Sequence, residues 1–205
     1  MSLASGPPGM EKLRSVALFC GSSNAADPAY LEAAAGFGRI LAAEGLRLVY
    51  GGGGVGLMGA GSKAAHAAGG EVLGIMPEFL RSREALYDEV ETVVVQTMHE
   101  RKTKMYDAAD AFAIFPGGIG TLEEVVELVS WRRLDLHRKP IVFLNIRGFW
   151  DPFFALIDHT VRERVTPDWL PGTWGSVERV EDVLPMIREM IVQAPPDTGE
   201  VAAKA

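Results

Sequence analysis

Short runs of apolar residues alternate along this chain with longer segments in which apolar positions recur at helical spacing. The runs are nearly continuous in Val, Ile, Leu and Phe, which is typical of strands that helices cover on both faces. We therefore predict strands at 15–20, 46–50, 71–76, 91–96, 111–115 and 140–145. We predict helices near 28–44, 57–68, 98–109 and 121–135, with further helices after residues 150 and 179.

The order of these elements determines the expected architecture. A strand, a helix and a next strand, repeated several times, build a parallel sheet through right-handed crossovers. We expect an α/β fold: a Rossmann-like doubly wound parallel β-sheet flanked by helices, in a single domain. Ligands of such sheets bind beyond the carboxyl ends of the strands, so chemistry is expected in the loops at those ends.

The two ends of the chain differ from the middle. Residues 1–12 are rich in Gly, Pro and Ser, and residues 194–205 are similar in kind. Such segments offer little apolar surface to offset the entropy of ordering, so we expect both tails to be disordered. Residues 13–193 would then form one Rossmann-like domain.

Composition removes several function classes from consideration. The single cysteine, Cys20, excludes a disulfide scaffold, and we expect it to be a small core residue. The net charge of −7 argues against nucleic acid or an anionic membrane as the main partner. No apolar run is long enough to span a bilayer and the start lacks the order of a signal peptide, so we expect a cytoplasmic protein. The histidines form no HExxH or HxH pair, so we expect no metal site, and we place His66, His137 and His159 at the surface or its boundary.

A first glycine-rich loop, residues 51–59, follows the second expected strand. Gly54, Gly56 and Gly59 fit the GxGxxG dinucleotide fingerprint, and Glu78 follows Gly54 by 24 residues, near the place of a ribose-binding acid. Glycine-rich turns between a strand and a helix bind any phosphate, however. The same glycines also suit a tight turn with close packing of helix on sheet, so this loop alone leaves the function open.

A second loop, residues 116–124, follows the fifth expected strand. Its glycines let the backbone turn sharply and direct N–H groups inward, and Thr121 would open a helix whose positive dipole end faces the loop. This arrangement predicts an anion site for one phosphate. Thr121 and Glu124 also fit a capping box, which would give Glu124 a purely structural role.

A third loop follows the fourth expected strand and begins with a capping box formed by Thr97 and Glu100. Three cations, Arg101, Lys102 and Lys104, would lie in the first two turns of the helix, where positive charge opposes the macrodipole. Their placement costs stability unless an anion or an acidic group is near. An arginine fork suits bidentate binding of phosphate or carboxylate, and the alternative is a solvated basic surface.

Four segments in a fixed order resemble one protein family. PGGIGTLEE (116–124) matches the motif PGGxGTxxE, and TMHERK (97–102) matches the segment of MHERK type that precedes it. FCGSS (19–23) and YGGGGVGLMG (50–59) match two earlier signatures. Over residues 15 to 180 the chain resembles the Lonely Guy family of cytokinin riboside 5′-monophosphate phosphoribohydrolases, long mislabelled as lysine decarboxylases.

This resemblance implies a reaction and a set of residues. The reaction is hydrolysis of the N-glycosidic bond of a cytokinin riboside 5′-monophosphate or AMP, which gives a free adenine-type base and ribose 5-phosphate without a cofactor. The implied catalytic residues are Arg101, which would position the nucleotide, and Glu124, which would stabilise positive charge on the ribose and orient water. Ser130 stands where the family has a threonine. The expected substrate-binding residues are Ser22, Gly52, Gly53, Glu84, Arg101, Lys102, Gly117, Gly118, Ile119, Gly120, Thr121, Leu122, Glu123, Glu124 and Ser130.

The resemblance further implies a homodimer with its site near the interface, and higher oligomers in some members. Two other classes of function remain as alternatives. A noncatalytic nucleotide-binding protein would need the same phosphate loops without chemistry at Arg101 and Glu124. An NAD oxidoreductase accounts only for the first glycine run, and lysine decarboxylation lacks a phosphate cup tied to a Schiff-base lysine. The preferred base, adenine or an N6-prenylated adenine, stays open at this stage.

Overall fold

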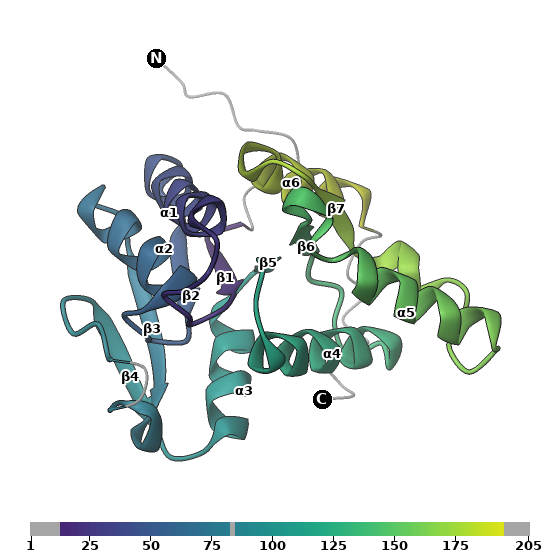
Figure 1. The fold of residues 1–205 in the computed structure, drawn as a ribbon, viewed down its shortest axis with the longest axis horizontal. Coiled ribbons are helices and arrows are strands. Elements are labelled where there is room, and N and C mark those ends of the chain that lie inside the picture. The colour runs from purple at the N-terminus through teal and green to yellow at the C-terminus, as the bar shows by residue number, and fades with distance from the viewer. Residues whose placement is uncertain (1–12, 83–84, 195–205) are drawn as a thin grey trace.

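The computed structural model describes residues 13–82 and 85–194. The tails expected to be disordered therefore lie, except for Ala194, outside the described residues, as does the expected substrate-binding residue Glu84. Within the described part, seven parallel strands form one sheet with the order β4-β3-β2-β1-β5-β6-β7 (Figure 1). These strands are β1 (Ser15–Phe19), β2 (Arg47–Tyr50), β3 (Val72–Pro77), β4 (Glu91–Val95), β5 (Ala111–Ile114), β6 (Ile141–Leu144) and β7 (Gly175–Val177).

Helices cover both faces of the sheet. The α-helices of the described residues are α1 (Pro28–Ala43), α2 (Gly56–Ala67), α3 (Met98–Ala108), α4 (Ile119–Arg133), α5 (Asp151–Arg162) and α6 (Val183–Gln193). Short 3₁₀ turns occupy Glu78–Leu80 (η2), Ile146–Gly148 (η3), Leu170–Thr173 (η4) and Val180–Asp182 (η5). None of the described helices combines the length and the apolar character that a membrane span needs.

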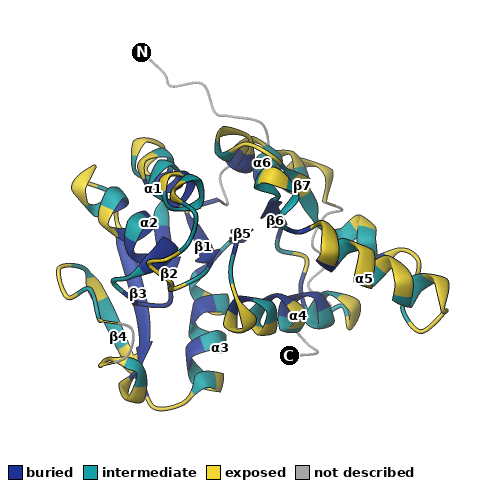
Figure 2. Cartoon of the chain, in the orientation of Figure 1, coloured by how far each residue is buried: buried dark blue, intermediate teal, exposed yellow. Residues whose placement is uncertain are grey.

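Two buried clusters show which helix packs on which face. One contains Phe37 of α1, Leu57 of α2 and Ile187 of α6, and the other contains Met105 of α3 and Val125 of α4. The five inner strands, β3, β2, β1, β5 and β6, lie between these clusters and are the most deeply buried part of the molecule (Figure 2). Each large apolar side chain removed from water in this way stabilises the fold by about 2–3 kcal/mol before the entropy cost of ordering is subtracted.

The strand order reverses between β1 and β5, so the connections that leave these two strands run to opposite sides. Their loops stay in contact: the Gly21 N–H donates to the Pro116 carbonyl over 3.0 Å. A Cβ atom on Gly21 would lie 3.3 Å from Gly117 Cα, so glycine permits this close approach. A reversal of strand order leaves a crevice outside the carboxyl ends of the strands, which is where sheets of this class bind ligands.

The expected α/β fold is confirmed, and every predicted strand and helix is present. One strand, β7, was not predicted because its three residues carry only one large apolar side chain, Val177. The expectation that both faces of every predicted strand are covered is wrong for β4. This strand lies at the edge of the sheet, and Val94 is 40% exposed.

Candidate active site

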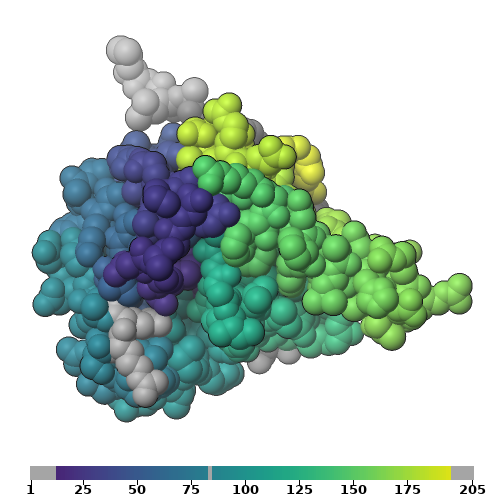
Figure 3. Space-filling view, in the orientation of Figure 1, coloured from purple at the N-terminus to yellow at the C-terminus, as the bar shows by residue number. Residues whose placement is uncertain are grey.

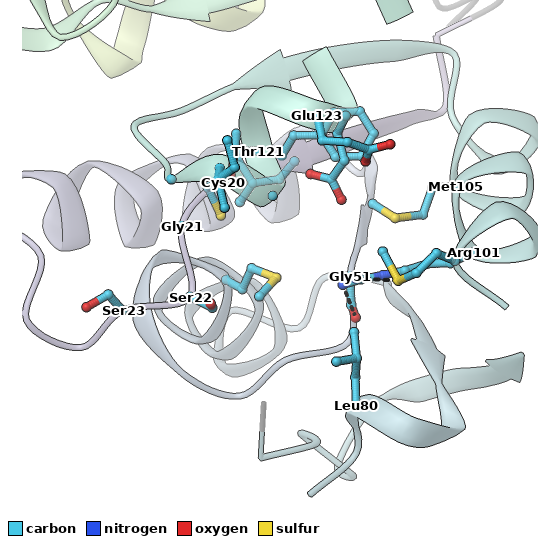
Figure 4. Close-up of a pocket in the computed structure, with 18 residues that line it drawn as sticks. Cys20, Gly21, Ser22, Ser23, Gly51, Leu80, Arg101, Met105, Thr121 and Glu123 are labelled. Carbon is cyan, nitrogen blue, oxygen red and sulfur yellow. Dashed lines mark hydrogen bonds between the residues drawn. The ribbon is translucent and has the colours of Figure 1, made fainter. Parts of the chain in front are cut away.

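A cavity of about 390 Å³ lies at the carboxyl ends of the central strands. Its walls come from the end of β1 and the loop after it, from Gly51 after β2, and from the first turns of α3 and α4 (Figure 4). The segment after β1, purple in Figure 3, lies on the surface between the two halves of the molecule. The lining residues are Leu18, Phe19, Cys20, Gly21, Ser22, Ser23, Gly51, Met58, Leu80, Met98, Arg101, Met105, Gly118, Ile119, Gly120, Thr121, Glu123 and Glu124.

The capped start of α3 brings Arg101 into the cavity. Thr97 is the N-cap, and its Oγ1 accepts a hydrogen bond from the Glu100 N–H over 3.0 Å. The Glu100 carboxylate in turn accepts from the N–H of Gln96, one residue before the cap, also over 3.0 Å. The predicted helix start at Thr97 is thus confirmed. With the first turn fixed in this way, Arg101 lies on the inner side of the helix and is only 4% exposed.

Backbone carbonyls at the ends of two strands hold the Arg101 guanidinium. Its Nε donates to the Ile75 carbonyl of β3 over 3.2 Å. Its Nη2 donates to the Gly51 carbonyl over 2.9 Å, and Figure 4 shows this second bond. A Cβ atom on Gly51 would lie 2.0 Å from Nη2, so no other residue fits at position 51 without displacing the guanidinium. A buried cation held by hydrogen bonds to fixed carbonyls is pre-organised to bind an anionic group of a ligand.

Lys102 points toward α4 and does not line the cavity. Its Nζ forms an ion pair with Glu123, and a second one with Glu127 over 3.0 Å, while the Lys102 side chain is 13% exposed. Burial lowers the pKa of Lys102, but the hydrogen bonds to these two carboxylates outweigh burial and raise the pKa above its usual value. Lys104 lies farther out, 3.9 Å from Glu100 of the same helix. Acidic groups therefore offset Lys102 and Lys104, two of the three cations at this helix start.

The start of α4 differs from the predicted one. The helix begins at Ile119 with Gly118 as N-cap, and no described side chain caps it. Thr121 is therefore the third helical residue and not the cap, so the predicted capping box with Glu124 is wrong. The Leu122 N–H donates to the Gly118 carbonyl, which leaves the N–H groups of the first three helical residues without an acceptor inside the helix. These donors and the helix dipole face the cavity, so this helix start suits an anion.

The start of α2, by contrast, is closed by the loop after β1. The Gly56 N–H donates to Asn24 Oδ1 over 2.8 Å, and the Leu57 N–H donates to the Gly21 carbonyl over 3.0 Å. A Cβ atom on Gly59 would lie 2.3 Å from the Gly54 carbonyl oxygen. The glycines of this loop therefore serve close packing of backbone on backbone. Glu78, the candidate ribose-binding acid, pairs with Arg81 in η2 and does not line the cavity.

Glu124 and Cys20 lie on neighbouring parts of the cavity wall. Burial, followed by the negative charge of Glu124, raises the pKa of Cys20 well above its usual value, so the group stays a neutral thiol. This fits the expectation that Cys20 is a small core residue. Among the described residues, no three His, Cys, Asp or Glu side chains are arranged to hold a metal ion.

The cavity contains part of the predicted site. Eight of the expected residues line it: Ser22, Arg101, Gly118, Ile119, Gly120, Thr121, Glu123 and Glu124. Six others do not: Gly52, Gly53, Lys102, Gly117, Leu122 and Ser130. Sequence reasoning missed Gly51 and the apolar wall, which includes Met58, Met98 and Met105. Three of these residues carry a sequence signal, because Gly51 and Met58 belong to the segment YGGGGVGLMG and Met98 directly precedes HERK.

Comparison with known proteins shows which family this chain resembles. A family model described as "Possible lysine decarboxylase" matches residues 58–187. The cytokinin riboside 5′-monophosphate phosphoribohydrolase LOG of Oryza sativa subsp. japonica is 44% identical over 153 residues, which cover 74% of this chain and 63% of that protein. Two proteins of Arabidopsis thaliana carry the same enzyme name, with the symbols LOG2 and LOG7. LOG2 is 44% identical over 88% of this chain and 85% of its own length. LOG7 is 40% identical over 90% of this chain and 77% of its own length.

Solved structures show the same fold at low sequence identity. The molybdenum cofactor carrier protein of Chlamydomonas reinhardtii superimposes with a TM-score of 0.68 at 19% identity, covering 89% of this chain and 100% of that one. The molybdenum cofactor binding protein of Rippkaea orientalis gives 0.66 at 22% identity, covering 88% of this chain and 98% of that one. At these identities the likeness concerns the fold alone.

Proposed function

The chain belongs to the Lonely Guy family, and from this membership we propose that it hydrolyses the N-glycosidic bond of an adenine-type nucleoside 5′-monophosphate. The products are the free base and ribose 5-phosphate, and with an N6-prenylated base the reaction releases an active cytokinin. One observation carries the proposal: an open helix N-terminus, Arg101 and Glu124 line the same cavity. Its 390 Å³ lies within the size range of sites that enclose small ligands.

The phosphate of the substrate binds at the start of α4. The N–H groups of Ile119, Gly120 and Thr121 supply donors, and the helix dipole favours the negative charge. Gly118 and Gly120 are exposed, and a Cβ atom at either would meet nothing within 4 Å, so a phosphate can approach this backbone closely. The walls formed by Met58, Met98 and Met105 give the base an apolar, adaptable surface.

The reaction places the hydroxyl of water on C1′ of the ribose and the remaining proton of that water on the released base. As the bond between ribose and base breaks, positive charge develops on the ribose ring, and a fixed carboxylate at Glu124 stabilises that charge and orients the attacking water. Arg101, held by carbonyls of two strands, positions the nucleotide. The neutral Cys20 thiol plays no part in this scheme.

Lysine decarboxylation, which the family description mentions, has no support in the residues of the cavity. That chemistry requires a lysine that forms a Schiff base with its cofactor. None of the described residues that line the cavity is a lysine, and Lys102 is held by two carboxylates on α4.

Release of free base tests the proposed reaction. Purified protein is incubated with AMP and with isopentenyladenosine 5′-monophosphate, and the products are separated by chromatography. We expect wild-type protein to release base from at least one nucleotide and Glu124→Ala to be slower by about 100-fold or more. Binding of AMP by both proteins with no release by either would instead identify a nucleotide-binding protein without catalysis. Wild-type turnover by Glu124→Ala would remove that residue from the mechanism.

We also propose that the chain forms a homodimer through the outer face of α4. Ile119, Val126 and Ser130 recur at helical spacing on this face, and the two apolar residues are 84% and 53% exposed. The inner face of the same helix is apolar too, with Val125 and Leu128 in the core, and three glutamates lie between the two apolar faces. An exposed apolar face of this kind is normally covered by a partner. Ser130, which does not line the cavity of its own chain, would then lie in the dimer interface.

A further inference from the structure

Ion pairs join the two helices that carry the proposed catalytic residues. Arg101 and Lys102 are neighbours on α3, and Glu123 and Glu124 are neighbours on α4. One residue of each pair lines the cavity as a proposed catalytic group. Lys102 points to α4 instead, where it pairs with Glu123 and, over 3.0 Å, with Glu127.

A second contact joins the same helices one turn farther from the cavity. The ring of Tyr106, one turn after Lys102, meets the ring of Trp131, one turn after Glu127, edge to face with centroids 5.2 Å apart. The two contacts form successive layers between α3 and α4. The ion pairs of Lys102 are the layer nearest the catalytic residues, so their loss would free the cavity ends of the helices while the aromatic layer keeps the far ends together.

Burial makes this ion pair more than a surface contact. The Lys102 side chain is 13% exposed and that of Glu127 is 25% exposed, whereas the Lys104–Glu100 pair on α3 is 44% and 42% exposed. Ion pairs with little solvent around them are less screened and hold a more definite geometry.

We propose that Lys102 and Glu127 act as positioning residues, which fix α3 relative to α4 and thereby Arg101 relative to Glu124. The inference rests on the proposed hydrolysis, because positioning has a measurable consequence in catalysis. It assigns Lys102 a role different from substrate contact, and it introduces Glu127, which lies outside the cavity wall. Displacement of a catalytic group by about 1 Å is enough to lower turnover strongly.

Two variants test the contact from its two sides: Lys102→Met removes both ion pairs, and Glu127→Gln removes one of them. We expect Lys102→Met to lower kcat for AMP by about 10-fold, and Glu127→Gln to lower it less, because the ion pair with Glu123 remains. KM should change by less than about 2-fold, because neither side chain lines the cavity. Lys102→Arg should retain most activity, since a guanidinium can bridge the same carboxylates. The double variant should be no slower than Lys102→Met, because that single change already removes the ion pair with Glu127.

Lys104→Met is the matched control. It removes a lysine and an ion pair from the same helix, but its partner Glu100 lies on α3 itself, so no contact with α4 is lost. We expect its kcat and KM to equal those of wild type. Thermal unfolding of all variants shows whether each is folded at the assay temperature.

The outcomes separate this proposal from the proposed function. If Lys102→Met raises KM at unchanged kcat while Glu127→Gln behaves as wild type, then Lys102 contacts the substrate and the positioning role is overturned. If wild-type protein releases no base, the proposed function fails. Amide hydrogen exchange in α3 and α4 then tests whether the ion pairs of Lys102 hold the two helices together. Faster exchange near the cavity in Glu127→Gln and Lys102→Met, but not in Lys104→Met, supports it; equal exchange in all variants overturns it.

Discussion

At the scale of single residues, the geometry of Arg101 depends on a glycine fifty positions earlier in the chain. Gly51 contributes a carbonyl that accepts from the guanidinium and leaves empty the space that a side chain would fill. A Cβ atom there would also lie 3.1 Å from Met58 Sδ. A side chain at position 51 would therefore meet both the guanidinium and a methionine sulfur. Because the surrounding core is closely packed, these groups could move only at a cost in stability.

Gly51→Ala should consequently impair catalysis far more than its size suggests. We expect kcat for base release to fall about 100-fold, because the added methyl group displaces a catalytic side chain from its productive position. Gly172→Ala is the control, since a Cβ atom there would meet nothing within 4 Å. If Gly51→Ala has the wild-type kcat in the chromatographic assay, the observed placement of the Arg101 guanidinium against Gly51 is not required for catalysis.

The sequence reveals some site residues and hides others for physical reasons. Arg101 stands in a segment rich in charge, and Glu124 follows a segment rich in glycine. A ligand site accounts for these segments better than a solvated surface or a simple turn does. Gly51 is one glycine in a run of four, and only the path of the folded chain shows which of them meets the guanidinium. Met105 resembles any core methionine, because a cavity wall and a core present the same apolar pattern.

At the scale of secondary structure elements, the helix starts that follow the three candidate loops prove different. α3 is capped by Thr97 as predicted, because that cap uses only local atoms. The start of α2 is closed by Asn24, more than thirty residues away in sequence, and no local pattern reveals such a partner. α4 begins two residues before its predicted start, with the backbone of Gly118 as its cap, which leaves this N-terminus open.

His137 links the end of α4 to the sheet, and it corrects another expectation. Expected at the surface or its boundary, it is only 2% exposed, and its Nε2 donates to the Leu128 carbonyl over 3.0 Å. Burial, with further contributions from the positive charges of Arg132 and Lys139, lowers the pKa of His137 to about 4. The folded protein therefore holds this imidazole neutral at pH values where the unfolded chain binds a proton.

This difference in proton binding predicts a pH dependence of stability. The unfolded chain takes up a proton at His137 below about pH 6.5, so the folded state loses stability as pH falls from 7 toward 4. Between pH 7 and 5 the loss from this group is about 2 kcal/mol. Urea unfolding at both pH values should show this loss in wild type and a correspondingly smaller one in His137→Gln. The exposed His159→Gln is the control, and an equal pH dependence of His137→Gln and wild type would contradict the assignment.

At the scale of the whole molecule, the fold follows from the order of its elements more securely than the site does. Strand–helix alternation with right-handed crossovers leaves few arrangements, and the observed sheet is one of them. The place of the site, beyond the carboxyl ends of β1 and β5, follows from the same rule. The short edge strand β7 and the outer face of α4 do not follow, because each depends on what lies beside it in space.

The outer face of α4 is the proposed interface of the homodimer. Because Val126 is 53% exposed, Val126→Asp should leave the fold of the single chain intact while placing a charge in the proposed dimer interface. We expect sedimentation to show a dimer for wild type and a monomer for this variant. Val192→Asp, which alters a residue 56% exposed on α6 across the sheet, should remain dimeric. Base release by the Val126→Asp monomer should also fall, because its cavity adjoins the face that a second copy would cover. A wild-type monomer at micromolar concentration would contradict the dimer, and the apolar face of α4 would then need another partner.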